Sequence, residues 1–283
     1  MKPLSSENKA ALVRLVETLQ LKGYSVNTIR TYRNEFIQLL SMLGPINVND
    51  LSTEHLRRYM LYCINELKLS EATLHSRLNA IKFYFENVLS REKIFVEIPR
   101  PKKPSNLPKF LSVIEVRQLL EVTTNLKHNT LLKMCYGMGL RVSEVVAIRL
   151  CDIDFHSMQV FIRRAKGKQD RYCNLPACMV DQIYQYEAQY KPKVYLFEGQ
   201  NGGLYTVRSA QAVFHNALLR ARIKKSVGIH ALRHSFATHL LDTGTQISFI
   251  QHLLGHKKIE TTLIYTRVTN MHLKNVRSPL DAL

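Results

Sequence analysis

Acidic residues are scarce in this 283-residue sequence, which has 22 Asp and Glu against 40 Lys and Arg and a formal net charge of +18. A surplus of this size favours a polyanionic partner, and nucleic acid is the usual one. No apolar run is long enough to span a bilayer, and no signal peptide begins the chain. These absences argue against a basic membrane-surface protein, and we expect a cytoplasmic, nucleoid-associated protein without a membrane partner.

Cysteines are few and irregularly spaced. The five lie at Cys63, Cys135, Cys151, Cys173 and Cys178, and no two form the close CxxC pair of a zinc knuckle. We therefore expect reduced thiols, as in an ordinary cytosolic protein. The sequence also lacks a Walker motif and a catalytic carboxylate pair, so the expected chemistry needs no cofactor.

The first 98 residues are predicted to form a helical domain. Apolar residues recur every three or four positions in four segments of this range. Gly23 and Gly44 end the first two segments, whereas Ser52 and Ser70 begin the third and fourth. Four helices with short connections are enough for a small domain of their own.

A proline-rich segment, 99–109, follows this helical domain. It holds four of the nine prolines and four basic residues but no acidic one. Prolines at this density stop helices and favour an extended linker, which can run along a phosphate backbone. Residues 1–98 carry a net charge of +3, the linker +4 and residues 110–283 +11. Most of the positive charge therefore belongs to the linker and the second domain.

The second domain, 110–283, is predicted to be mainly helical with a small β-sheet. Ser112 and Glu115 have the spacing of a capping box, and another helix is expected from Ser143 to Ile148. From Met158 the apolar period changes to two, and a turn at 165–168 separates two short strands. This pattern predicts a β-hairpin with Lys166 at its tip.

A short C-terminal stretch concentrates residues that can act on a phosphate. His230 and Arg233 lie one helical turn apart, and His256 and Tyr265 follow. Arginine offers a planar fork of donors to phosphate oxygens, and histidine can donate to the same group or move a proton. A tyrosine oxygen can form a covalent bond to phosphorus.

A zinc site is the alternative interpretation of these histidines. His230 and His234 are spaced four residues apart, as are His252 and His256, and such a pair can present two ligands on one helical face. Neither pair has the glutamate of the HExxH signature, and Arg233 would repel a cation beside it. We therefore favour phosphate chemistry without a metal.

In chain order, the motifs GLRVSE, AKGK, HALRH, LLGH and IYTR resemble those of the tyrosine recombinase (phage integrase) family, over nearly the whole chain. The resemblance implies an N-terminal four-helix SAM-like core-binding domain, which includes the stretch Ser25–Tyr32, and an α+β catalytic domain. It gives Glu144 a structural role in supporting the first arginine. The catalytic residues that it implies are Arg141, Lys166, His230, Arg233, His256 and Tyr265.

The same resemblance implies the partners and the subtype. Double-stranded DNA recombination sites would be gripped by two domains in a clamp, and a homotetramer would hold two sites, with accessory DNA-bending proteins as candidate partners. The end of the chain, 276–283, is similar to that of mobile-element and integron-type integrases, but no inserted segment precedes HALRH, so Xer-like recombinases also fit. Candidate base-reading residues are Arg30, Arg33, Arg77 and Lys82, and candidate tail contacts are Leu273, Val276 and Leu280.

Two other functions remain open at this point. A type IB topoisomerase would use similar chemistry to relax DNA without exchanging strands. A DNA-binding regulator could keep the fold without catalysis, although the full set of six residues argues against it.

Overall fold

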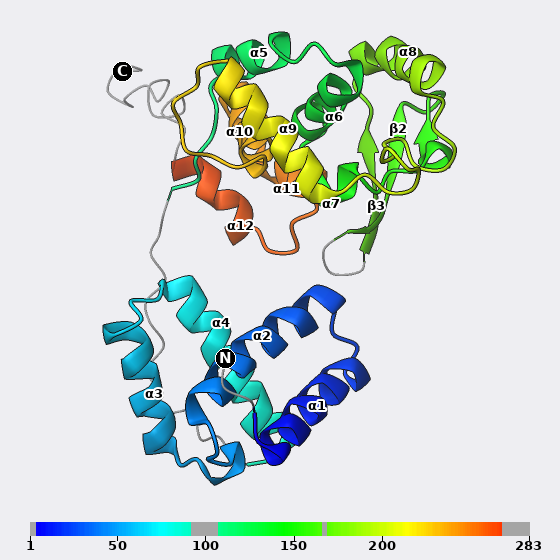
Figure 1. The fold of residues 1–283 in the computed structure, drawn as a ribbon. Coiled ribbons are helices and arrows are strands. Elements are labelled where there is room, and N and C mark those ends of the chain that lie inside the picture. The colour runs from blue at the N-terminus through cyan, green and yellow to red at the C-terminus, as the bar shows by residue number, and fades with distance from the viewer. Residues whose placement is uncertain (1–3, 92–106, 166–168, 268–283) are drawn as a thin grey trace, which may run out of the picture. The chain divides into compact units, whose positions relative to one another are not determined.

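The computed structural model describes residues 4–91, 107–165 and 169–267. The chain divides into two compact units, Met1–Ser105 and Asn106–Leu283, which we call the first and the second unit (Figure 1). Most of the predicted linker, 99–109, falls outside the described residues, so its extended form and its boundaries stay predictions. None of the helices in the described ranges combines the length and the apolar character that crossing a lipid bilayer requires.

The first unit contains the four predicted helices. Serine side chains at 25, 52 and 70 cap α2, α3 and α4 by accepting a hydrogen bond from a backbone N–H three residues on. A 3₁₀ turn at Val48–Asp50 precedes α3, and a π-helical turn at Tyr84–Val88 extends α4. The helices are α1 (Ser6–Leu21), α2 (Val26–Leu43), α3 (Thr53–Asn65) and α4 (Glu71–Phe83).

Arg77 was predicted as a candidate for reading DNA bases, and the structure shows that this is wrong. The residue is only 6% exposed, and its Nε donates to Glu35 Oε2 at 2.9 Å. This ion pair joins α4 to α2 inside the first unit. Arg30 and Arg33 lie on the exposed surface, whereas Lys82 is half-buried and pairs with Glu86.

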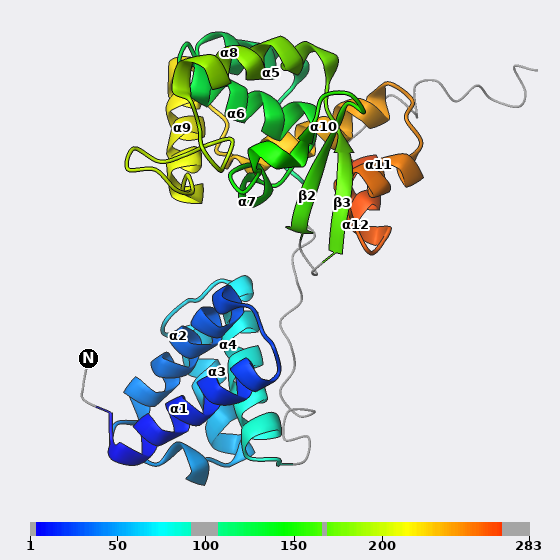
Figure 2. The same ribbon diagram turned by 90° about the vertical axis from the view of Figure 1, so that its right-hand side faces the viewer.

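The second unit packs helices around a three-stranded antiparallel sheet in the order β1-β2-β3. Figure 2 shows β2 and β3 side by side as the predicted hairpin, and in the register Val160 lies opposite Cys173. The elements are α5 (Val113–Glu121), α6 (Leu126–Gly137), α7 (Val142–Val145), β1 (Ile153–Asp154), β2 (Gln159–Ala165), β3 (Gln169–Asn174), α8 (Val180–Tyr190), α9 (Val207–Arg220), α10 (His230–Asp242), α11 (Ile247–Leu254) and α12 (Glu260–Leu263).

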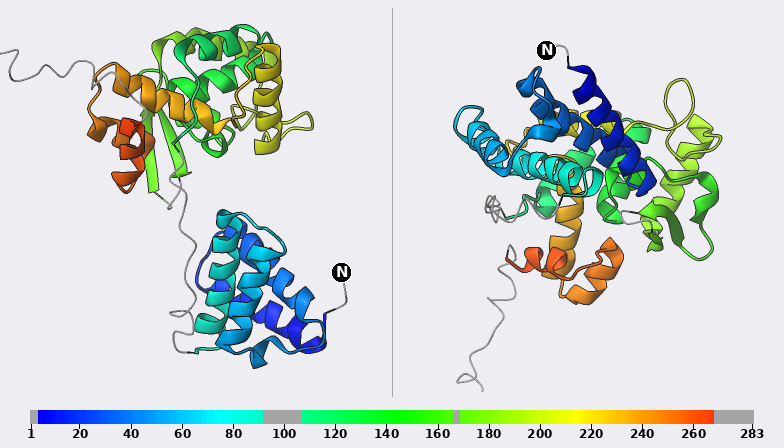
Figure 3. Two further views of the ribbon diagram at one scale, coloured as in Figure 1. Left: turned by 90° about the vertical axis from the view of Figure 1, so that its left-hand side faces the viewer. Right: turned by 90° about the horizontal axis from the view of Figure 1, so that it is seen from below.

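Helix α10 is central to the second unit because it contacts α6, α11 and the 3₁₀ turn Ile264–Arg267. Figure 3 shows the orange and red helices α11 and α12 next to each other at one end of this unit. The contacts of α10 bring segments far apart in the sequence to one place.

The short helix α7 begins and ends differently from the expectation. It was predicted from Ser143 to Ile148, but it spans Val142–Val145 with Arg141 as its N-cap residue. The Glu144 carboxylate accepts the backbone N–H of Arg141 at 2.9 Å, so it satisfies the N–H at the start of this one-turn helix. Glutamate therefore replaces the predicted serine as the residue that fixes the start of this helix.

Candidate active site

Arg233 is the buried centre of the candidate site, on the first turn of α10, with a side chain 1% exposed. Its guanidinium donates to Gly139 O at 2.8 Å and to Leu254 O at 2.6 Å. Burial and the nearby positive charge of Arg141 lower the pKa of Arg233 to about 10, and the guanidinium stays charged at neutral pH. The helix thus places a fixed cation between the turn before α7 and the end of α11.

His256 follows α11 and lies against this cation. Arg233 Nη2 and His256 Nε2 are 3.0 Å apart, and because an arginine can only donate, Nε2 accepts. The proton of the neutral ring is then on Nδ1, which donates to Thr262 Oγ1 at 2.9 Å. Burial and the charge of Arg233 lower the pKa of His256 to about 4. His256 is therefore neutral here, in one defined tautomer.

Glu144 is the counter-ion of the site. Its side chain is 5% exposed and accepts from Arg141 Nη1 at 2.7 Å, while Arg233 Nη1 lies 3.9 Å away. Burial alone would raise the pKa of Glu144, but hydrogen bonds and charge from Arg171 and Arg141 lower it to about 2. One carboxylate thus faces three guanidinium groups, and the excess positive charge suits an anionic ligand.

Arg171 is a member of this network that the sequence did not single out. It lies on β3 and holds Glu144 with a fork of two hydrogen bonds, Nη1 to Oε1 at 3.1 Å and Nη2 to Oε2 at 2.8 Å. The sequence signal was its alternation with the buried Cys173, which places Arg171 on the same face of the strand. An arginine on a buried strand face needs a partner, but the sequence could not say which carboxylate supplies it.

Two glycines make the close packing around the site possible. Gly139 has φ +59°, and a Cβ there would lie 2.3 Å from a ring carbon of Phe236 on α10. Gly255 ends α11 with φ +62°, and a Cβ there would lie 3.0 Å from Arg171 Cδ. The glycine of GLRVSE therefore lets the backbone pack against Phe236, and the glycine of LLGH lets it approach Arg171.

Tyr265 lies in the 3₁₀ turn after α12, 2% exposed, in an apolar cluster with residues of α10 and α11. Its Oη is 3.0 Å from Nδ1 of His234. Burial raises the pKa of Tyr265, while the charges of Arg233 and Arg141 act to lower it. The charges of two arginines of the same chain therefore act on this phenol.

His234 is a second residue whose role the sequence did not indicate, beyond the zinc alternative. Its ring lies edge-on to that of His230, with 4.6 Å between centroids, one turn away on α10. Burial, followed by the charges of His230 and Arg233, lowers the pKa of His234 to about 4. His234 directly follows Arg233 in the sequence, and its ring contacts Tyr265. This contact exists only because the tertiary packing brings Tyr265 next to α10.

The structure brings five of the six predicted residues to one region. Arg141, Arg233, His256 and Tyr265 interact as described above, and the exposed His230 affects the pKa of His256. The sixth, Lys166, lies outside the described residues. Within residues 4–91, 107–165 and 169–267, no group of three or more His, Cys, Asp or Glu residues is arranged to hold a metal ion.

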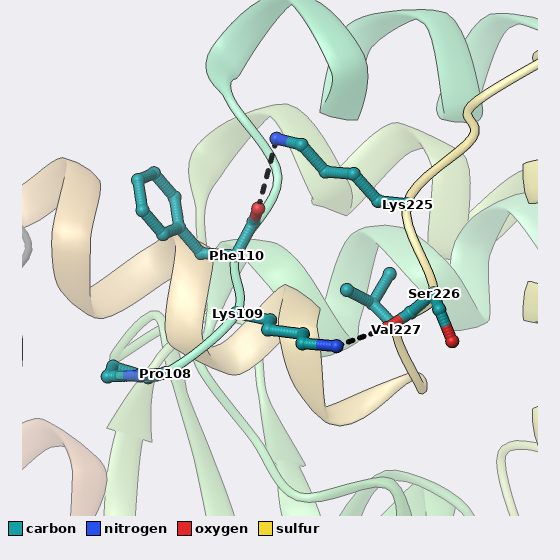
Figure 4. A pocket seen from close by; sticks show the side chains of 6 residues that line it. All are labelled: Pro108, Lys109, Phe110, Lys225, Ser226 and Val227. Carbon is teal, nitrogen blue, oxygen red and sulfur yellow. Dashed lines mark hydrogen bonds between the residues drawn. The ribbon is translucent and has the colours of Figure 1, made fainter. Parts of the chain in front are cut away.

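A hollow of about 340 Å³ lies between residues 108–110, at the start of the second unit, and residues 225–227, which precede α10 (Figure 4). Lys109 and Lys225 line it. Lys109 Nζ donates to Ser226 O at 3.4 Å, and Lys225 Nζ donates to Phe110 O at 3.3 Å. Lys225 also pairs with the Glu115 carboxylate at 2.6 Å. These contacts join the segment before α10 to the start of the second unit.

Comparisons with known proteins agree over both units. The model of the phage integrase family matches residues 109–272, and that of the phage integrase N-terminal SAM-like domain matches residues 12–94. The putative integrase/recombinase y4qK of Sinorhizobium fredii is 35% identical over 275 residues, covering 95% of this chain and 88% of that protein. Tyrosine recombinase XerA of Pyrococcus horikoshii is 33% identical over 274 residues, covering 94% and 92%.

Solved structures share the fold of the chain. The crystal structure of XerA recombinase has a TM-score of 0.56 at 25% identity and covers 96% of this chain and 100% of that one. XerH site-specific recombinase bound to difH substrate gives 0.72 at 18% identity, covering 96% and 97%. A lambda integrase dimer bound to a COC′ core site gives 0.75 at 14% identity, covering 95% and 98%.

Proposed function

The chain belongs to the phage integrase family and is a tyrosine recombinase, and from this premise we propose that it cleaves and rejoins specific DNA sites through a 3′-phosphotyrosyl bond to Tyr265. The observation that carries the proposal is the convergence of Arg141, His256 and Tyr265 on Arg233, with Glu144 as the counter-ion of the two arginines. Cations, a neutral imidazole and a phenol in one place are what a phosphoryl transfer without a metal requires.

The arginines would bind the scissile phosphate. Arg141 and Arg233 neutralise the charge that grows on the non-bridging oxygens as phosphorus becomes five-coordinate. Negative charge next to His256 would raise the pKa of its ring. A second proton on Nε2, in place of the hydrogen bond from Arg233, would make the imidazole a further donor to the phosphate. His230 is exposed beside the same group, and it can donate to the phosphate or accept a proton during the reaction.

Tyr265 would act as the nucleophile and Lys166 as the general acid. The phenol oxygen forms a bond to phosphorus while the bond to the 5′-oxygen breaks, and Lys166 supplies the proton that this oxygen needs. A 5′-hydroxyl from another strand reverses the step. Because the phosphotyrosyl bond keeps the energy of the broken phosphodiester, rejoining needs no ATP.

Double-stranded recombination sites would be bound by both units, with a homotetramer holding two sites and accessory DNA-bending proteins as further candidate partners. The net charge of +18 supports a large phosphate contribution to affinity, and binding should weaken steeply with salt. Arg30 and Arg33 remain candidates for contacts in the major groove because they are exposed on α2. Leu273, Val276 and Leu280, proposed to dock on a neighbouring protomer, lie outside the described residues.

Replacing the nucleophile tests this function directly. Tyr265→Phe should abolish covalent attachment to a nicked suicide duplex, because the only lost atom is the attacking oxygen, while DNA affinity stays unchanged. Tyr184→Phe is the matched control, since Tyr184 is half exposed on α8 and stacks on Phe155. An adduct that persists in Tyr265→Phe would refute the assignment. A wild-type protein that binds DNA but never forms an adduct would instead indicate a regulator.

The leaving-group proton tests Lys166. Lys166→Ala should slow cleavage by about 100-fold or more, the usual contribution of a general acid. A 5′-thio leaving group departs without a proton, so it should restore the rate of this variant. If the thio substrate is cleaved as slowly as the ordinary one, Lys166 does not act as the acid.

Site-independent relaxation of a supercoiled plasmid by monomers would favour a topoisomerase.

A further inference from the structure

The hydrogen bond between Tyr265 and His234 adds a residue to the six that the family resemblance implies. The phenol Oη lies 3.0 Å from His234 Nδ1, and the two ring centroids are 5.6 Å apart. From this contact we infer that His234 accepts the phenol proton when Tyr265 attacks phosphorus. The inference rests on the proposed function, because it takes Tyr265 as the nucleophile.

Donor and acceptor roles follow from the surroundings of the pair. Tyr265 is 2% exposed and His234 is half-buried, so water does not easily replace the bond between them. The charged and titratable groups acting on His234 are His230 and Arg233 on its own helix, with Tyr265 facing it from the 3₁₀ turn. Burial, followed by the charges of His230 and Arg233, lowers the pKa of His234 to about 4, so the imidazole is neutral and Nδ1 can accept from the phenol.

The position of the pair suits proton removal during attack. Burial raises the pKa of Tyr265, and the charges of Arg233 and Arg141, which act in the opposite direction, favour the phenolate that forms as the proton leaves. A phosphate bound by the same arginines would cancel part of their positive charge, and that change favours an imidazolium at His234. The same event therefore places the phosphorus before Tyr265 and strengthens His234 as a base.

The protons balance over the reaction. During cleavage the Oη–H bond of Tyr265 breaks, its proton goes to His234 Nδ1, and the Oη–P bond forms. The P–O5′ bond breaks, and O5′ takes a proton from Lys166. During rejoining, the incoming 5′-hydroxyl returns its proton to the lysine, and the imidazolium returns its proton to the phenol. The neighbouring His230 is exposed, and its ring centroid lies 4.6 Å from that of His234.

Two variants separate hydrogen bonding from proton transfer. His234→Asn places an amide oxygen near the position of Nδ1, where it can accept a hydrogen bond but cannot take the proton. His234→Gln places its amide near Nε2 and loses the contact. Both should bind DNA as the wild type does, and single-turnover cleavage of a suicide duplex should slow by about 100-fold. The rates of both variants should rise more steeply with pH than that of the wild type, because hydroxide must then remove the proton.

A ring-fluorinated tyrosine at position 265 provides the decisive measurement, because its phenol is more acidic. Fluorination should recover most of the lost rate in His234→Asn, and it should not rescue Lys166→Ala, which lacks a different proton. Wild-type rates in both variants, or equal acceleration by fluorination in variant and wild type, would overturn the role of His234. If either result is found and Tyr265→Phe is inactive, the proposed function remains and only the role of His234 is refuted. If Tyr265→Phe still cleaves DNA, both proposals are refuted.

Discussion

Replacing Glu144 with glutamine should destabilise the second unit by about 3 kcal/mol. The carboxylate is 5% exposed and accepts hydrogen bonds from Arg141 and Arg171. Its pKa is lowered from 4.5 to about 2, and a difference of that size corresponds to about 3 kcal/mol of interaction with the ionised form. Glutamine keeps the shape of the side chain but leaves the buried arginines without their counter-charge.

The effect should depend on pH in a defined direction. Because the folded pKa lies below the unfolded one, the stabilisation is complete above about pH 5 and declines as the pH falls towards 2. At about pH 3, more than half of the difference between wild type and Glu144→Gln should be lost. A group with a raised pKa would give the opposite trend.

The free energy of unfolding can be measured for the full chain with urea and far-ultraviolet circular dichroism, with hydrogen exchange in α10 assigning the change to the second unit. Glu54→Gln is the control, since Glu54 is 53% exposed on α3 and its pairs with Arg57 and Arg58 are worth less than about 1 kcal/mol. A Glu144→Gln effect below that of the control, or one that is the same at about pH 7 and pH 3, would refute the account.

Two further substitutions test the packing. Gly139→Ala should destabilise the second unit by about 2–4 kcal/mol, because it combines a positive φ with a clash against Phe236. Thermal unfolding measures the change, and an unchanged unfolding midpoint would contradict the clash. Arg77→Gln should cost about 3 kcal/mol, because it leaves the partly buried Glu35 without its ion pair. Arg30→Gln should leave stability unchanged and weaken DNA binding in an electrophoretic shift. The burial of Arg77 would be contradicted if Arg77→Gln left stability unchanged and weakened DNA binding as much as Arg30→Gln does.

Local sequence patterns predicted the elements of the fold well. The serines at 25, 52 and 70 and the apolar period of about 3.6 predicted three of the helices in the first unit, and the period of two predicted the hairpin. These signals lie within one turn or one strand, so they depend little on the rest of the chain. The start of α7 was missed because Glu144, rather than Ser143, closes its cap.

The motifs of the candidate site were also visible in the sequence, because each is a short run of residues with its own local geometry. The sequence by itself determined the helical first unit, the mixed second unit, the excess of positive charge and the order of Arg141, His230, Arg233, His256 and Tyr265. It placed Arg77 on the surface, however, because a helical pattern does not reveal which polar residue finds a buried partner.

Only the tertiary structure decided which side chains meet. Arg171 and Glu144 are 27 positions apart and pair because the hairpin of β2 and β3 packs beside α7. His234 and Tyr265 are 31 positions apart and pair because the 3₁₀ turn Ile264–Arg267 packs against α10. Such contacts depend on how whole elements pack, and burial together with the charged neighbours then sets the pKa of each group. The chain order of the residues therefore indicates the chemistry, whereas the packing determines which atom can give or take each proton.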